Sequence, residues 1–424
     1  MKIFRSFIAF ALICFALSPT AQAVSPPPDG GYPNFTTAEG DHALEAFTLG
    51  VVGNTAIGAY SLFSVTTGGY NTAVGAGALE FNTAENNTAT GAAALLFNTT
   101  GTENTANGTA ALELNDTGNF NTAIGGFALF SNTEGGSNTA TGLQALFSNT
   151  TGSANTANGE SALVSNTTGS ENTANGFEAL ALNITGNFNT ANGDQALFRN
   201  TTGDANTANG AQALFINATG QRNTAIGVQA LFNNTTGTGN TANGAFALFG
   251  NTTSTDNTAN GLLALSSNTT GNNNTAVGVN ALLGNTTGAE NIALGVNAGS
   301  RLTTGNGNID IGNIGNGAEA NTIRIGEQGV QTATFIAGIN GVNASAGSPV
   351  YILSTGRLGT AQPPPIASTS AGTTVPVHFK EEMKAMKATI AHQQKQIEAL
   401  TAGLQRVSAQ LAASKSAPQV VNNP

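Results

Sequence analysis

The stretch NTATGLQALFSNTTGSA, residues 138–154, is one copy of a unit that recurs through most of the chain. Its opening signature, Asn-Thr-Ala-x-Gly, is first met at Asn54. From Asn104 to Asn308 it returns every 17 residues, with some substitutions near the end, and a degenerate copy is expected at Asn321. Self-similarity at a fixed short period is typical of a repeat protein, in which each unit packs mainly on its neighbours.

Every repeat follows one residue pattern. In the copy that starts at residue 121 the recurring residues are Asn121, Thr122, Ala123, Gly125, Ala128, Leu129, Phe130 and Asn132. We expect two short extended segments per repeat, as at Thr139–Thr141 and Ala145–Ser148, because each ends near Asn or Gly, which tolerate positive φ in turns. A 17-residue unit cannot bury its apolar side chains alone, so successive coils must stack and pair their backbones. The pattern therefore predicts an all-β repeat solenoid over residues 54–326.

Stacked repeats place equivalent side chains in rows along the solenoid. The residue after Asn-Thr-Ala is Ile124 in one copy and Asn107 in another, which indicates a half-exposed position. Ala145, Leu146 and Phe147 are consecutive, so the pattern leaves open which face of each strand points inward. A flat coil of this size has little interior. We therefore expect this apolar row to face outwards and to be covered by a symmetric partner.

Residues 1–23 have the pattern of a secretory signal peptide. Lys2 and Arg5 precede an apolar run from Phe7 to Leu17, and Ala21-Gln22-Ala23 matches a small-residue cleavage site. The apolar run is too short for an ordinary membrane-spanning helix. We expect export to the medium, the cell surface or the periplasm, and a mature chain without a transmembrane segment. Cys14 is the only cysteine and lies in the part that would be removed, so disulfides are not expected.

The segment after the signal, residues 24–53, is predicted to be a leader and an N-terminal cap, which the open end of a solenoid needs. From there to the start of the C-terminal helix the chain is acidic: residues 24–379 contain 20 acidic and five basic side chains. A field of this sign disfavours nucleic acid and acidic lipid as partners.

The repeat pattern breaks down after residue 326. Residues 327–362 are predicted to be a neck-like β segment, with strands at Thr332–Ile339 and Val350–Leu353, and residues 363–374 a linker rich in Pro, Ser and Thr. Residues 375–413 are predicted to be a coiled-coil helix, and residues 414–424 a polar tail. The helix prediction rests on a seam with alternating steps of three and four, formed by Met383, Met386, Ile390, Gln393, Ile397, Leu400, Leu404, Val407 and Leu411. The heptads alone do not separate a dimer from a trimer.

The sequence contains no pattern that indicates catalysis, a cofactor or a metal site. His42, His378 and His392 are far apart, and Asp310 has no acidic partner in its repeat. The recurring Asn-Thr-Thr triplets, as at Asn149, are formal glycosylation sequons, but their fixed place in the repeat favours a turn role. The column of phenylalanines that includes Phe147 is expected to be core or trimer interface rather than a carbohydrate-stacking strip.

Repeats such as Asn121-Thr-Ala-Ile-Gly and Asn274-Thr-Ala-Val-Gly resemble the head repeats of bacterial trimeric autotransporter adhesins, and similar repeats occur in phage tail-fibre proteins. The resemblance covers roughly residues 54–326 and extends through the neck-like segment and coiled coil to about residue 412. It implies a left-handed β-roll in a homotrimer, followed by a neck and a stalk. The 17-residue period is longer than is usual for those heads. The anchoring β-barrel of the adhesins and the self-cleaving chaperone of the tail fibres have no counterpart, so the resemblance implies a head and stalk without a membrane anchor.

Two functions are compatible with these features, and a third is disfavoured. The first is a non-enzymatic secreted or cell-surface fibre that mediates attachment through an unknown glycan or protein receptor, with phage-tail-fibre-like receptor binding as a variant of it. The second is an ice- or crystal-binding solenoid, because regular threonine ladders can match a lattice. A polysaccharide-cleaving β-helix enzyme is disfavoured, because it would need clustered carboxylates.

Overall fold

The computed structural model describes residues 33–46, 51–331, 333, 350–352, 358–360 and 377–414, and gives helix side chains over 384–410. The chain divides into two compact units, Met1–Ile336 and Ala337–Pro424. The expected signal peptide and the Pro/Ser/Thr linker lie outside the described residues. So does almost all of the strand expected at Thr332–Ile339.

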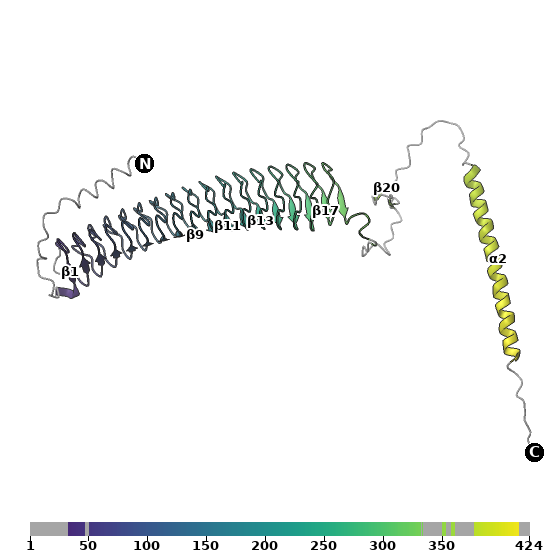
Figure 1. Ribbon diagram of the computed structural model, residues 1–424, viewed down its shortest axis with the longest axis horizontal. Helices are drawn as coiled ribbons and strands as arrows, with labels where there is room; N and C mark the ends of the chain where they lie inside the picture. Colours follow the sequence, from purple (N-terminus) through teal and green to yellow (C-terminus); the bar gives the residue numbers. More distant parts are fainter. Residues whose placement is uncertain are drawn as a thin grey trace, which may run out of the picture. The chain divides into compact units, whose positions relative to one another are not determined.

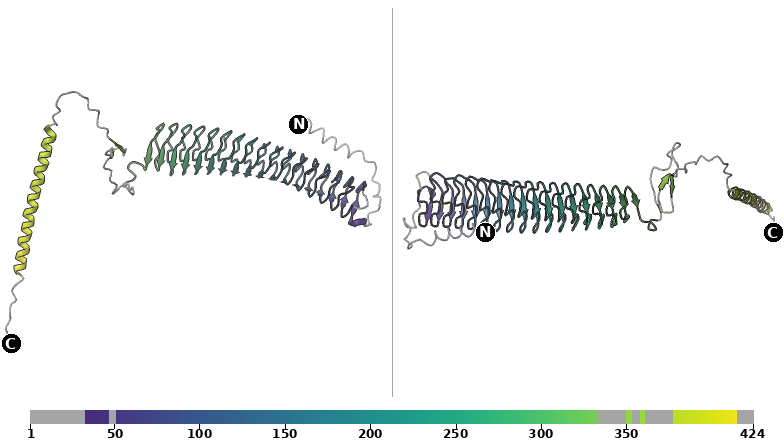
Figure 2. Two further views of the ribbon diagram at one scale, coloured as in Figure 1. Left: turned by 180° about the vertical axis from the view of Figure 1, so that it is seen from behind. Right: turned by 90° about the horizontal axis from the view of Figure 1, so that it is seen from above.

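The first unit is a parallel β-solenoid in which each coil contributes one short strand to a single sheet (Figure 1). A short 3-10 turn, η1 (Pro33–Phe35), precedes it. The strands are β1 (Thr37–Glu39), β2 (Thr55–Ile57), β3 (Thr72–Val74), β4 (Thr88–Thr90), β5 (Thr105–Asn107), β6 (Thr122–Ile124), β7 (Thr139–Thr141), β8 (Thr156–Asn158), β9 (Thr173–Asn175), β10 (Thr190–Asn192), β11 (Thr207–Asn209), β12 (Thr224–Ile226), β13 (Thr241–Asn243), β14 (Thr258–Asn260), β15 (Thr275–Val277), β16 (Ile292–Leu294), β17 (Ile309–Ile311) and β18 (Ile323–Ile325). Consecutive strands pair in register, and the stack of coils bends gently along its length (Figure 2).

Only one of the two extended segments expected per repeat is a strand. Thr139–Thr141 forms β7, whereas Ala145–Ser148 is a turn, so that prediction was wrong. The reason is the backbone: Gln144 and Leu146 have φ values of 58° and 53°, in the left-handed region that a strand cannot contain. Coils still pair here, because Leu146 N–H donates to the carbonyl of Ala162 in the next coil (2.9 Å).

The core lies inside each chain. Ala140, Ala145 and Leu146 are fully buried, and the equivalent residues are buried in nearly every other coil. In the strand, Ala140 points inward between two outward neighbours, as the two-residue period requires. The left-handed residues in the turn then bring both Ala145 and Leu146 inward although they are consecutive. The expected outward-facing apolar row is therefore wrong for Ala and Leu, and only Phe147 lies half-exposed on the outside.

Two columns of buried asparagines tie the coils together. In the first, which precedes the strands, Asn138 Nδ2 donates to Asn121 Oδ1 (3.1 Å) and to the carbonyl of Gly152 (2.9 Å). In the second, in the turn, Asn149 Nδ2 donates to Asn132 Oδ1 (2.7 Å) and to the same Gly152 carbonyl (2.9 Å). Buried amides are costly unless paired, so these bonds favour an Asn at both positions in the coils from β3 to β15. In the second column Val65 and Leu302 take the place of Asn in the coils just outside this range.

The ends of the solenoid differ from the sequence expectation. β1 lies in the segment expected to be leader and cap, and its Thr37 pairs with Thr55, so the solenoid begins one coil before Asn54. At the other end Ile309 pairs with Ile323, which places Thr322, not Asn321, in the amide column: Thr322 N–H donates to Asn308 Oδ1 (3.1 Å). The last coil is therefore shorter than the others.

The second unit contains a hairpin and a helix. β19 (Val350–Ile352) and β20 (Leu358–Thr360) are antiparallel, as the predicted strand at Val350–Leu353 anticipates. The helix α2 (Val377–Ser414) matches the predicted span of 375–413 within two residues. Among the described residues no helix is both long and apolar enough to cross a membrane.

Candidate functional surfaces

The outer face of the sheet is a long, uncharged and regular surface. In each coil the strand presents its first and third residues outwards around a buried alanine, as Thr122 and Ile124 do around Ala123. Every strand from β2 to β15 begins with threonine, and the third residue is Asn, Thr, Ile or Val. No strand between β2 and β16 contains a charged residue. We call the outward residues of β2–β15 the Thr/Asn face.

The hydroxyls of this face are free, unlike those of a second threonine row. In the turn, Thr150 Oγ1 donates to the carbonyl of Thr167 (3.0 Å) and Thr235 Oγ1 to that of Thr252 (2.9 Å). Across β2–β15, all of which the structure describes, no strand threonine uses its hydroxyl in a hydrogen bond within the chain. The amides are mostly free as well, although Asn175 Nδ2 donates to Asn192 Oδ1 (2.8 Å). The Thr/Asn face can therefore offer evenly spaced donors and acceptors to a ligand.

A column of phenylalanines runs along another side of the coils. The rings of Phe198, Phe215, Phe232 and Phe249 stack at centroid distances of 5.2, 5.0 and 5.2 Å. Phe130 and Phe147 form a shorter stack at 5.1 Å. These rings are half-exposed, so of the expected core or trimer interface the structure excludes the core of the chain, and the interface stays a prediction.

Two glutamates replace phenylalanine in this column. Burial raises the pKa of Glu80 above its ordinary value and that of Glu113 to about 7. Two coil steps separate them, about 10 Å at the usual strand spacing. Raised carboxyl pKa values are common in active sites. At that distance, however, the two carboxyls do not contact each other, so they do not indicate a catalytic pair.

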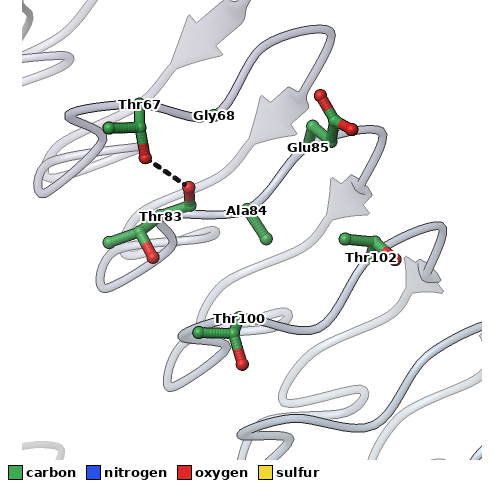
Figure 3. A pocket seen from close by; sticks show the side chains of 7 residues that line it. All are labelled: Thr67, Gly68, Thr83, Ala84, Glu85, Thr100 and Thr102. Carbon is green, nitrogen blue, oxygen red and sulfur yellow. Dashed lines mark hydrogen bonds between the residues drawn. The ribbon is translucent and has the colours of Figure 1, made fainter.

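A shallow hollow of about 260 Å³ lies between the coils near the N-terminal end (Figure 3). It is lined by Thr67, Gly68, Thr83, Ala84, Glu85, Thr100 and Thr102. Thr72 pairs with Thr88, so this coil has one residue fewer than its neighbours, and its turn at Thr83–Glu85 is short. Thr67 Oγ1 donates to the carbonyl of Thr83 across the hollow (3.1 Å). Glu85 is the only charged residue in the lining, so the hollow is best explained by the missing residue.

The histidines and the sequon asparagines either have structural roles or lie apart from one another. His42 pairs with Glu45 and stacks on Tyr60, while His392 is exposed on α2 and His378 has no described side chain. Within the described part of the chain no three acidic, histidine or cysteine side chains form a group that could hold a metal. The sequon asparagines such as Asn149 are fully buried and donate twice through Nδ2, which supports the turn role and leaves no room for a glycan in the folded coil.

Asp310 is a buried carboxyl whose setting the sequence did not reveal. It replaces the inward alanine of β17, is 1% exposed, and neither of its oxygens has a hydrogen-bond partner. Burial, with a smaller contribution from the negative charge of Glu319, raises its pKa to about 6, although Arg324 opposes the shift. Arg324 is held by Glu319 instead, through bonds of 2.8 and 2.6 Å. The position of Asp310 beside β18, in a shortened last coil, does not follow from the repeat pattern.

The apolar seam expected on α2 is unpartnered in the single chain. The described members Met386, Ile390, Ile397, Leu400, Leu404 and Val407 are 57–77% exposed, and Gln393 is exposed between them. Met383 and Leu411 lie in the helix, but their side chains are outside the described residues. A helix with an exposed apolar seam at heptad spacing fits partner helices, which is consistent with the predicted coiled coil.

Comparisons with models of protein families, with curated proteins and with solved structures found no match for this chain.

Proposed function

We propose that this protein is an exported, non-enzymatic fibre that attaches to a repetitive surface through the Thr/Asn face of its solenoid. The observation that carries the proposal is the run of in-register side chains over β2–β15, in which the threonine hydroxyls are free and most amides are free. Each such contact is weak, but many identical contacts on one rigid body bind with high avidity. The resemblance to adhesin heads supports the same role, with a glycan or protein receptor that the chain does not identify.

In this proposal α2 joins copies of the chain in a stalk. The exposed seam supports association, and the adhesin resemblance favours three copies. The signal-like residues 1–23 support export to the cell surface, the medium or the periplasm. A homo-oligomer would multiply the number of binding faces, which strengthens attachment further.

The test is binding of the full chain to a panel of glycans and extracellular-matrix proteins. The double variant Asn175→Lys, Asn209→Lys places charge on the Thr/Asn face, where the side chains point away from the core. A matched control, Thr202→Lys, adds a lysine on an exposed turn outside the strands. We expect the double variant to lose binding at least tenfold and the control to keep it. Equal binding by both variants would refute the role of this face.

The second candidate is binding to ice or another crystalline surface. It is favoured by one specific feature: threonine hydroxyls that repeat at the coil step, about 4.8 Å, on a surface without charge. The variable third residue weakens it, because Asn, Ile and Val alternate with Thr. Thermal hysteresis by the full chain, abolished in the double lysine variant, would promote this candidate over adhesion. A phage-tail-fibre-like role would instead appear as binding to whole bacterial cells.

A further inference from the structure

The outer face of the sheet changes chemistry at its C-terminal end. Where the strands from β2 to β15 begin with threonine, the last three begin with isoleucine, and their third residues are Leu or Ile. These outward residues, which we call the aliphatic end patch, are Ile292, Leu294, Ile309, Ile311, Ile323 and Ile325. Register places them in two columns, Ile292–Ile309–Ile323 and Leu294–Ile311–Ile325.

The side chains of the patch are apolar, and most of them are exposed to solvent. Ile292 and Leu294 are 45% and 49% exposed, and Ile323 and Ile325 are 65% and 72% exposed. Elsewhere on the sheet an outward aliphatic residue has mostly polar neighbours, as Ile226 has between Asn209 and Asn243. Ile57 and Val74 pair with each other, but each has a threonine as the other outward residue of its strand. Only at β16–β18, within the described sheet, are both outward residues aliphatic in consecutive strands. A contiguous exposed apolar area of this kind is often a contact surface.

Its size decides how such a contact can form. Six aliphatic side chains, five of them 37–72% exposed and Ile309 partly buried, amount to on the order of 300 Å² of apolar surface per chain. A stable interface needs about 800 Å² per partner. The patch is therefore too small to hold two molecules together alone, and must act with a second contact that brings its partner close.

The same chain supplies that second contact and a reason for its partner to be another copy. The seam of α2 is exposed and has the heptad spacing that fits a copy of itself. The patch is uncharged and self-complementary, as a symmetric contact requires. By contrast, residues 24–379 contain 20 acidic and five basic side chains, so the rest of the solenoids repel one another.

We propose that the aliphatic end patch is a contact between copies of this chain, formed by β16–β18 only, while the Thr/Asn face of every copy stays free for its ligand. The inference rests on the proposed function in one respect, since association through α2 would raise the effective concentration of one end patch for another. It places the boundary between contact and free surface at the step from Thr275–Val277 to Ile292–Leu294.

Cross-linking of the full chain tests this directly, because Cys14 is the only cysteine. In a Cys14→Ser background, single cysteines are placed in the patch (Leu294→Cys), on the Thr/Asn face (Asn209→Cys) and beside the helix seam (Gln394→Cys), and a short bis-maleimide is added. We expect covalent oligomers from Leu294→Cys and Gln394→Cys, and none from Asn209→Cys. Oligomers from Gln394→Cys alone would overturn the inference and leave the proposed stalk intact. No oligomer from any variant would overturn both. Equal cross-linking at Asn209→Cys would overturn the inference by extending the contact along the whole face.

A second variant measures how much the patch contributes. The change Ile292→Thr, Leu294→Asn, Ile323→Thr, Ile325→Asn gives these strands the outward residues of the middle coils, so folding should be retained. We expect its oligomer dissociation constant in sedimentation to rise at least tenfold. The control Ile124→Asn, Ile226→Asn removes exposed aliphatics of the same row outside the patch and should leave the constant unchanged. A patch variant that associates as tightly as the parent would contradict the inference.

Discussion

At the scale of single residues, the fold depends on leucines in an unusual backbone conformation. Leu146 and its equivalents have φ near 53°, which costs an ordinary residue about 1–2 kcal/mol. Each of these leucines is fully buried, which is worth about 1.5–3 kcal/mol. Burial therefore offsets the strain, whereas in the coil of β16 this position is taken by Gly299 (φ 60°), which relieves the strain but loses the side chain.

The buried amide columns make a residue-scale prediction. Asn200 donates to Asn183 Oδ1 (2.8 Å) and accepts from Asn217 Nδ2 (2.7 Å). Asn200→Ala would leave the buried Asn183 Oδ1 without a donor, and Asn217 Nδ2 would keep only its bond to the carbonyl of Gly220. Each buried polar group that loses a partner costs about 1–3 kcal/mol. We expect a loss of about 2–5 kcal/mol in the free energy of unfolding, measured by denaturant titration. Asn209→Ala, on the exposed face, should change it by less than about 0.5 kcal/mol. Equal effects would mean that the columns do not stabilise the fold.

Asp310 makes the last coil sensitive to pH. Its folded-state pKa of about 6 lies above the ordinary 3.8, so the folded chain holds the proton more tightly than the unfolded chain. This group's contribution to stability is therefore fully favourable below about pH 4, falls as pH rises to 6, and is constant above that. We expect Asp310→Asn to slow amide hydrogen exchange across β17 and β18 at pH 7.5, by on the order of 1–3 kcal/mol in opening free energy. At pH 4 the variant should match the parent. A benefit independent of pH would show that charge is not the cause.

At the scale of elements, α2 carries a polar residue within an apolar seam. Gln393 needs a facing partner when buried, which costs stability but disfavours shifted registers. We expect Gln393→Leu to raise the melting temperature of the 375–415 peptide, followed by circular dichroism, and to broaden its oligomer distribution. Gln394→Leu, one position off the seam, is the control and should change neither. If both variants melt alike, the seam does not lie where the heptads place it.

Periodicity in the sequence predicts some of these elements correctly and fails to predict others. The 17-residue period, the strands beginning at Thr139 and its equivalents, and the span of α2 follow from periodicity, because each repeats many times. The turn at Ala145–Ser148 was misread as a strand, because nothing in the sequence marks a leucine for positive φ. The aliphatic end patch was visible as Ile and Leu at β16–β18, but it required the strand register to become a surface. The buried setting of Asp310 results from the short final coil. That coil departs from the 17-residue period, so the repeat did not predict the setting.

At the scale of the whole molecule, the position of the core decides what the helix is needed for. The inward alanines and leucines form one continuous buried cluster from Leu44 to Leu302 within a single chain. A solenoid that buries its core alone can fold coil by coil, with each coil stabilised by its neighbours. Association through α2 and the end patch then adds to a body that is already folded.

Deleting residues 375–424 should therefore leave the solenoid folded. We expect the truncated chain to keep its β-type circular dichroism and a cooperative melt even at low micromolar concentration, because none of its buried alanines or leucines depends on a partner. It should sediment as a smaller species than the full chain, since the end patch alone is too small for a stable interface. A full-length chain with Ile390→Ser and Ile397→Ser, which weakens the seam without truncation, should behave in the same way. If the truncated chain is instead unfolded at every concentration tried, the coils cannot form without association, and the intrachain core is not sufficient for the fold.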